Sequence, residues 1–252
     1  MKNLQYWMLG LCLGVSISFI PLGAYNVGVC VTATYKYSKF INPFLDSCRK
    51  HFLKGHNITY FVFTDHNIIP DSDTVIVYQA HKPWPEITLK RFENYYNAQS
   101  LLSKMDYIFA SDVDMLFVND VDESILGERV STRHPYFLDE NRQKYTYEDN
   151  PISAAYIDPR QGKYYFAGGF YGGSYKEFIK MVKILTDNIN KDLQHNFIAV
   201  WHDESHLNRY FVDYLPTVIL PASYCYPEGQ QYPFNPILIA LEKNKVELRD
   251  EK

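Results

Sequence analysis

The stretch YIFASDVDMLFVND, residues 107–120, begins as an apolar run with strand chemistry and then carries two aspartates one residue apart, Asp112 and Asp114. A buried strand gains nothing from two adjacent like charges, because each carboxylate is costly to remove from water unless a cation or hydrogen bonds compensate it. The residues that follow, MLFV, are apolar again, which argues against a solvated loop. A positive charge is therefore expected beside Asp112 and Asp114.

Strands and helices alternate around this stretch. Strands are expected over 27–34, 58–65, 74–78 and 106–111, and helices over 38–52 and 86–104. Alternation of this kind predicts an α/β fold with a mostly parallel sheet. Ligands bind beyond the carboxyl ends of the strands in such sheets, and the aspartate pair follows the fourth strand. The pair is therefore expected at a binding site.

The second half of the chain is mixed but continuous. A glycine-rich strand is expected over 162–174, followed by helices over 176–193 and 204–214. No repeat, low-complexity tract or linker divides the sequence. We therefore expect one domain over residues 26–252, preceded by a separate segment over residues 1–25.

The N-terminal segment is typical of a signal anchor or a signal peptide. Its residues 7–22 are uncharged and apolar, and two small residues, Gly23 and Ala24, follow them. Cleavage near Ala24 would leave almost no tail before the first strand. We therefore expect a membrane protein with a single-pass N-terminal anchor, in the Golgi if the chain is eukaryotic; a secreted or a cytoplasmic location is the alternative.

The overall composition narrows the class of protein. The 252 residues carry a net charge of -4, which provides no basic footprint for nucleic acid, so no nucleic-acid partner is expected. The four cysteines have no CxxC spacing, so neither a disulfide framework nor a zinc ribbon is expected. Aromatic residues make up 16% of the chain, and aromatics with a polar group suit flat, half-polar ligands such as sugars and bases.

The aspartate pair does not belong to an EF-hand. Asp112 and Asp114 have the spacing of its first ligands, but Leu116 and Phe117 stand where that loop needs an oxygen ligand and a glycine. Two carboxylates at a strand end instead suit a hard divalent ion that keeps positions open for the phosphate oxygens of a ligand. Mn²⁺ or Mg²⁺ fits that description.

The stretch WHDESH, residues 201–206, is the densest polar cluster. Its acidic residues suit the N-terminus of a helix, where they complement the helix dipole. A zinc site is a second interpretation, since His202 and His206 have the spacing of the HExxH motif, although Asp203 replaces the glutamate of that motif. A zinc metallohydrolase that uses this cluster is therefore one functional alternative.

Five strings together resemble the retaining glycosyltransferases of family 6, which include the blood group A and B transferases, α-1,3-galactosyltransferase and bacterial relatives. They are DYIFASDVDM, HPYF (134–137), KYTYE (144–148), YYFAGGFYGGS and WHDESHLNRYF, and the similarity runs from about Val27 to Lys243. The resemblance implies a GT-A-type fold, in which a mixed, mostly parallel central sheet is flanked by helices and a nucleotide-binding half is fused to an acceptor-binding half.

The resemblance also implies a reaction and its ligands. The expected reaction moves GalNAc, or else Gal, from a UDP-sugar to the 3-hydroxyl of a β-galactoside-terminated glycan or glycolipid, in an α linkage and with a metal ion. A galactoside-binding protein without catalysis is the remaining alternative. Glycine at position 169 implies room for an N-acetyl group, which favours UDP-GalNAc over UDP-Gal.

The matching motifs carry site residues onto this chain. Glu204 is the expected catalytic residue beneath the anomeric carbon, either as a nucleophile or as a stabiliser of same-face attack, and it also borders the acceptor. By the same resemblance Asp112 and Asp114 are the expected metal ligands, with Mn²⁺ as the expected ion and Mg²⁺ as the alternative. The other expected acceptor residues are His134, Thr146 and Trp201. The expected donor residues are Thr32, Ala33, Thr34, Tyr37, Arg91, Asp112, Val113, Asp114, Ala167, Gly168, Gly169, Asp203 and Lys243.

Overall fold

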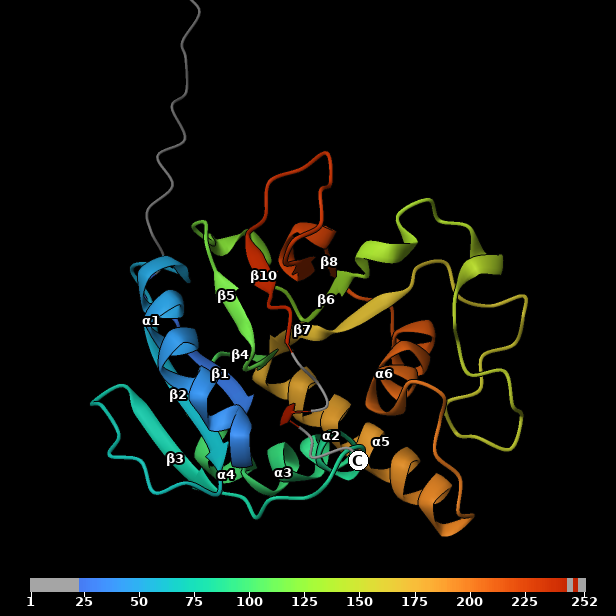
Figure 1. Ribbon diagram of the computed structural model, residues 1–252, viewed down its shortest axis with the longest axis horizontal. Coiled ribbons are helices and arrows are strands. Elements are labelled where there is room, and N and C mark those ends of the chain that lie inside the picture. The colour runs from blue at the N-terminus through green and yellow to red at the C-terminus, as the bar shows by residue number, and fades with distance from the viewer. Residues whose placement is uncertain (1–22, 244–246, 249–252) are drawn as a thin grey trace, which may run out of the picture.

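The computed structural model describes residues 23–243 and 247–248 (Figure 1). The apolar run at residues 7–22, on which the expected membrane anchor depends, lies outside these residues. No helix in the described part of the chain is both long enough and apolar enough to cross a membrane.

A seven-stranded sheet forms the centre of the molecule. Its strands, in spatial order, are β3 (Thr74–Tyr78), β2 (Asn57–Thr64), β1 (Asn26–Thr32), β4 (Tyr107–Asp112), β7 (Phe166–Ser174), β6 (Arg129–Arg133) and β8 (Val218–Leu220). β7 is antiparallel to both of its neighbours, and the other pairs in this sheet are parallel. The prediction of a mixed, mostly parallel sheet is confirmed.

A second, small sheet brings the C-terminal part of the chain to the aspartate pair. It consists of β5 (Met115–Phe117), β10 (Leu238–Ala240) and β9 (Tyr226–Pro227), with β10 antiparallel to β5. Just beyond β10, the amide of Leu241 donates a hydrogen bond to the carbonyl of Asp114 at 3.0 Å. This pairing places the segment that follows β10 beside the end of β4.

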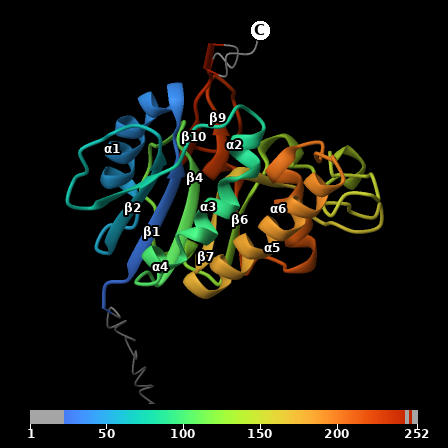
Figure 2. The same ribbon diagram turned by 90° about the horizontal axis from the view of Figure 1, so that it is seen from below.

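Helices cover both faces of the central sheet (Figure 2). One face packs against α1 (Ile41–His51). The other face packs against α2 (Glu86–Leu89), α3 (Arg91–Asn97), α4 (Gln99–Leu102), α5 (Tyr175–Gln194) and α6 (His202–Asp213). Short 3-10 helices are η1 (Tyr35–Phe40), η2 (Glu123–Ile125), η3 (Pro135–Phe137), η4 (Arg142–Lys144) and η5 (Ala222–Cys225).

The expected single helix over 86–104 is wrong, because the segment forms the three short helices α2, α3 and α4. The backbone leaves regular helical geometry at Lys90 and at Ala98, where ψ is -4° and 7°. These two bends keep Leu89, Phe92 and Leu102 buried in one core beneath the sheet. Tertiary packing therefore overrides the helical pattern of the sequence.

The alternation of strand side chains produces two cores. Along β1, Val29 and Val31 point toward α1, whereas Cys30 between them belongs to the core beneath α3 and α5. The same division holds on β4, where Phe109 faces one core and Ile108 the other. Both faces of the sheet are thereby closed to water, which leaves the strand ends as the place for a site.

The glycines at the end of β7 allow close backbone packing. A Cβ added at Gly173 would collide with the carbonyl of Glu128 just before β6, and one added at Gly172 would collide with the carbonyl of Ile108 on β4. Backbone atoms cannot move aside without breaking the ladder of hydrogen bonds.

Gly173→Ala is accordingly expected to lower the free energy of unfolding by about 3 kcal/mol. The urea midpoint, measured with an unchanged slope, checks this loss. Gly23→Ala is the matched control, since an added Cβ at Gly23 would meet nothing within 4 Å. Equal midpoints for the two variants would contradict the packing argument.

Candidate active site

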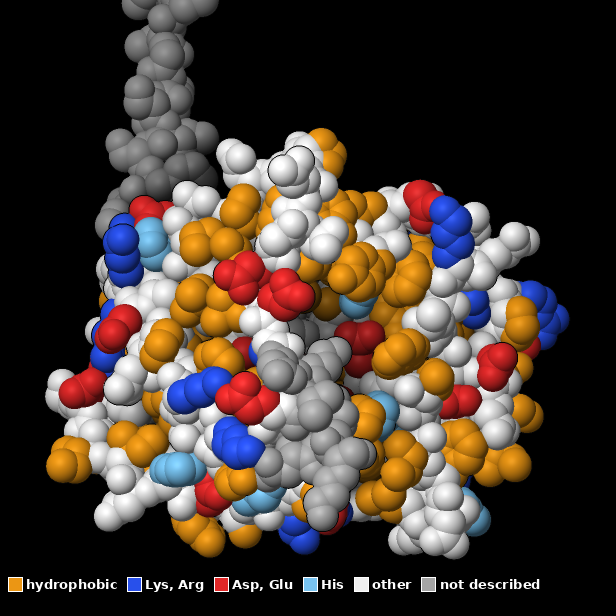
Figure 3. Space-filling view, viewed as in Figure 1, with side chains coloured by type: hydrophobic (Ala, Val, Ile, Leu, Met, Phe, Trp, Pro, Cys, Tyr) orange, Lys and Arg blue, Asp and Glu red, His pale blue; other side chains and the backbone are white. Residues whose placement is uncertain are grey.

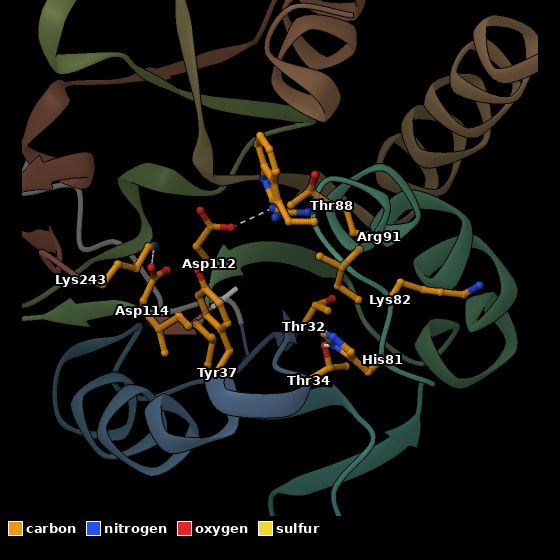
Figure 4. Close-up of a pocket in the computed structure, with 14 residues that line it drawn as sticks. Thr32, Thr34, Tyr37, His81, Lys82, Thr88, Arg91, Asp112, Asp114 and Lys243 are labelled. Carbon is orange, nitrogen blue, oxygen red and sulfur yellow. Dashed lines mark hydrogen bonds and ion pairs between the residues drawn. The ribbon is translucent and has the colours of Figure 1, made fainter. Parts of the chain in front are cut away.

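A pocket of about 120 Å³ opens at the carboxyl ends of β1 and β4 (Figure 4). Its lining includes most of the expected donor residues, namely Thr32, Thr34, Tyr37, Arg91, Asp112, Val113, Asp114 and Lys243. They come from four separate parts of the chain: the neighbouring strands β1 and β4 with the turns that follow them, helix α3, and the segment after β10. The other five expected donor residues do not line it: Ala33 is fully buried in the core beside α1, and Ala167, Gly168, Gly169 and Asp203 lie on β7 and α6.

Sequence reasoning missed α2 and the segment that leads to it from β3 as part of this pocket. His81, Lys82, Trp84, Ile87 and Thr88 line it, together with Leu248 near the C-terminus. The imidazole Nδ1 of His81 is 3.1 Å from the hydroxyl of Thr34, which is 47 residues away in sequence. Nothing in the local sequence pattern indicates this contact.

Arg91 connects the aspartate pair with helix α6. Its Nη1 lies 2.8 Å from Oδ1 of Asp112, and its Nε lies 3.2 Å from Oδ2 of Asp203. The side chains of Arg91 and Asp203 are only 12% and 14% exposed, whereas that of Asp112 is 36% exposed, so the row of charges is desolvated at Asp203 and open to the pocket at Asp112. Burial raises the pKa of Asp203, and the positive charge of Arg91 opposes that rise.

Lys243 lies on the other side of the pocket and forms an ion pair with Asp114 (Figure 4). Asp114 is only 4% exposed, so its charge depends on this partner rather than on water. The positive charge expected beside the two aspartates is thus confirmed, and Arg91 and Lys243 both supply it.

The pair fits a hard divalent ion that shares its coordination with a ligand. Asp112 and Asp114 place two carboxylates at the same strand end, which is the donor chemistry that such an ion prefers, and the buried Oδ2 of Asp114 is the oxygen that pairs with the ammonium group of Lys243. Within the described residues, no group of three or more His, Cys, Asp or Glu side chains gathers in a way that could hold a metal ion. An ion held by this pair would therefore take its remaining ligands from phosphate oxygens or water, as Mg²⁺ and similar ions do.

Glu204 lies on the first turn of α6, with both carboxylate oxygens engaged. Oε1 accepts a hydrogen bond from the hydroxyl of Tyr165 at 3.0 Å, and Oε2 accepts one from the amide of Gly168 at 2.8 Å. Burial raises the pKa of Glu204 to about 7, and the two hydrogen bonds oppose that rise. The side chain can consequently exist in both protonation states near neutral pH.

Residues 167–169 of β7 lie between Glu204 and the sulfur atoms of Met115 and Cys225. A Cβ added at Gly168 would lie 3.5 Å from Glu204. A Cβ added at Gly169 would lie 3.1 Å from Sδ of Met115 and 3.6 Å from Sγ of Cys225. Ala167 is buried within the strand. Gly169 therefore packs closely against flexible or small side chains, which would have to shift slightly to admit a Cβ.

Two of the expected acceptor residues, His134 and Thr146, lie beside Tyr165, the hydrogen-bond partner of Glu204. The imidazole of His134 packs edge-on against the ring of Tyr165, with 5.6 Å between ring centroids. Burial lowers the pKa of His134 to about 4, so its imidazole is neutral at pH 7. Thr146 is exposed beside Tyr165. Trp201, which precedes α6, is 48% exposed. Figure 3 shows acidic side chains recessed near the centre of this face, below a rim of hydrophobic side chains.

The two histidines of the zinc interpretation have different surroundings. The ring of His202 packs on that of Trp84, which lines the pocket, with 4.6 Å between ring centroids. His206 is 1% exposed, and its Nε2 lies 3.5 Å from Asp192 on α5. His206 therefore takes part in a buried contact between helices, and the geometry does not favour a zinc site. Helix α6 also begins at His202, two residues earlier than expected.

Comparisons with known proteins agree with this geometry. The model of glycosyltransferase family 6 matches residues 20–249. Globoside alpha-1,3-N-acetylgalactosaminyltransferase 1 of Gallus gallus is 32% identical over 246 residues, which cover 92% of this chain and 71% of the relative. Histo-blood group ABO system transferase 1 of Rattus norvegicus is 34% identical over 213 residues, which cover 81% of this chain and 61% of the relative. The chain thus spans 61% to 71% of the length of these two relatives.

Proposed function

The chain belongs to glycosyltransferase family 6, and from that premise we propose that it transfers GalNAc, or else Gal, from a UDP-sugar to a β-galactoside with retention of the anomeric configuration. The bond formed is an α linkage to the 3-hydroxyl. The observation that carries the proposal is the row Asp112, Arg91, Asp203, which joins the pocket at the strand ends to the helix that bears Glu204. A phosphate group and a sugar can then occupy one continuous site.

The donor occupies the pocket at the ends of β1 and β4. Thr32, Thr34 and Tyr37 line the part beside β1, where uridine would lie. Asp112 and Asp114 would hold Mn²⁺, or Mg²⁺, and the bound ion supplies positive charge that offsets the charge developing on the leaving diphosphate. Arg91 and Lys243 add positive charge from the protein itself, at a place where burial strengthens its effect.

Glu204 acts on the sugar carbon that reacts. Retention requires either a carboxylate that attacks this carbon or one that stabilises its positive charge while the acceptor attacks from the same face. Both roles need an ionised and precisely held carboxylate, and the hydrogen bonds from Tyr165 and Gly168 favour the ionised form. The exposed ring of Trp201 offers the acceptor galactose a stacking surface, with His134 and Thr146 as polar partners.

The proposed preference for UDP-GalNAc over UDP-Gal depends on the glycine at position 169. Gly169→Ala adds a methyl group at 3.1 Å from Sδ of Met115, so the backbone or Met115 must shift, which would narrow the site on the side proposed for the N-acetyl group. We expect the ratio of kcat/KM for UDP-GalNAc over UDP-Gal to fall by about 10-fold, because one methyl group changes discrimination by roughly 1–3 kcal/mol. Steady-state rates with both donors measure this ratio.

Gly168→Ala is the control for that experiment, since its methyl group would face Glu204 rather than Met115. It should reduce the rates with both donors to a similar extent and leave their ratio near that of the unaltered protein. An unchanged ratio in Gly169→Ala would contradict the donor assignment without touching the transferase assignment.

The transferase assignment is tested with purified protein, each UDP-sugar and methyl β-galactoside. The expected result is release of UDP that depends on the acceptor, with a disaccharide product whose α-1,3 linkage is read by NMR spectroscopy. A galactoside-binding protein would bind the acceptor but release no UDP. A zinc hydrolase would instead retain zinc after dialysis and lose its activity in His206→Ala.

A further inference from the structure

Tyr165 contacts Glu204 directly but belongs to none of the expected sets of site residues. It immediately precedes β7, and its side chain is 2% exposed. Its hydroxyl donates to Oε1 of Glu204 at 3.0 Å, while the amide of Gly168, three residues further on, donates to Oε2 at 2.8 Å. One short segment therefore holds both oxygens of the same carboxylate.

The ring of Tyr165 is itself held by packing. It stacks on the ring of Tyr147 with 5.2 Å between ring centroids. The rings of Phe137 and His134 also pack against it, with centroid distances of 4.7 Å and 5.6 Å. The backbone carbonyl of Tyr165 also accepts a hydrogen bond from the amide of His134 at 2.9 Å. The hydroxyl consequently has a defined position, with His134 beside the ring and Glu204 at its polar end.

Resting on the proposed function, we propose that Tyr165 is a positioning residue, which orients the Glu204 carboxylate toward the reacting sugar carbon and toward the acceptor. With Gly168 alone as donor, the carboxylate could rotate about one hydrogen bond. With Tyr165 as the second donor, its plane is determined. The residue acts through Glu204 and need not touch either substrate.

Tyr165→Phe removes only the hydroxyl and keeps the packed ring. We expect kcat for transfer to fall by about 10²-fold, because a misplacement of reacting groups by about 1 Å has an effect of this size. The KM for the donor should stay within about 2-fold of its value in the unaltered protein. A loss confined to kcat distinguishes orientation of Glu204 from a general disturbance of the donor pocket.

The pH profile provides a second readout. Burial raises the pKa of Glu204 to about 7, and Tyr165 acts against that rise, so its removal should raise the pKa further. Asp203 and Asp112, whose charges also raise this pKa, and the neighbouring thiol of Cys225 are unchanged in the variant. Because transfer needs the ionised carboxylate, the acidic limb of kcat should move to higher pH, and the deficit of the variant should shrink between pH 6.5 and 9.

Tyr147→Phe is the matched control, since it removes a hydroxyl from the ring stacked on Tyr165. That hydroxyl donates to the carbonyl of Tyr164 at 2.5 Å rather than to Glu204. We expect kcat within about 2-fold of the unaltered protein and the same acidic limb. Equal kcat values and equal pH profiles for the two variants would overturn the role of Tyr165. Unaltered protein that releases no UDP would instead overturn the proposed function, and this inference with it.

Discussion

Glu204→Gln is expected to lower kcat for sugar transfer by about 10³-fold or more, with little change in the donor KM. The amide keeps the shape of the side chain but can neither attack the anomeric carbon nor carry the negative charge that stabilises it. Binding of UDP depends on groups at the other end of the site, around Asp112, Asp114 and Lys243. Transfer rates and UDP affinity, measured separately, therefore distinguish lost chemistry from lost binding.

The same substitution should raise stability at neutral and alkaline pH. The pKa of Glu204 is about 7 in the folded protein, above its ordinary value of 4.5, so the folded state binds this proton more tightly than the unfolded state. Stability is therefore lost as the pH rises from about 4.5 to 7, by up to about 3 kcal/mol. Glutamine does not ionise, so Glu204→Gln should unfold at a higher urea concentration at pH 8, and the difference should vanish near pH 4.

Glu204→Gln is thus expected to lower the transfer rate and to raise the stability at pH 8, and few other roles of Glu204 would produce both changes. A variant that loses both activity and stability at pH 8 would show that Glu204 supports the fold rather than the reaction. A variant that keeps more than a tenth of the activity would exclude Glu204 as the group on which transfer depends.

The aspartate pair is the second place where a large effect is expected. The double variant Asp112→Asn, Asp114→Asn should lose Mn²⁺ binding, measured by calorimetry in the presence of UDP, and its transfer rate should fall by about 10²- to 10³-fold. Chelation of divalent ions should reproduce the loss of rate in the unaltered protein, and added Mn²⁺ should reverse it.

Asp120→Asn is the matched control for this double variant. Asp120 is an exposed aspartate whose partners are Lys54 and His51, each at 2.8 Å, and it does not line the pocket. Its replacement should leave Mn²⁺ binding and the transfer rate unchanged. A full transfer rate of the unaltered protein in the presence of chelator would contradict the metal requirement, and Arg91 and Lys243 would then be the charges that stabilise the leaving diphosphate.

The local sequence pattern was sufficient for much of the fold. The strand expected over 74–78 has the bounds of β3, and the strands around it differ from prediction by one or two residues at each end. Runs of β-branched and aromatic residues identify such strands because both faces of the sheet are buried. The break of the expected helix over 86–104 was not predictable, because it depends on which side chains the sheet and α5 can accommodate.

The order of residues along the chain is enough to predict the chemistry available to this protein, namely the paired carboxylates at a strand end, the acidic start of α6 and the small residues of β7. How these groups are held depends on contacts formed in the folded molecule. Arg91 reaches Asp203, Lys243 reaches Asp114 through the pairing of β10 with β5, and Tyr165 reaches Glu204 from 39 residues away. Such contacts join segments that are distant along the chain. Their geometry follows from the packing of the sheet and helices, which no local pattern of residues records.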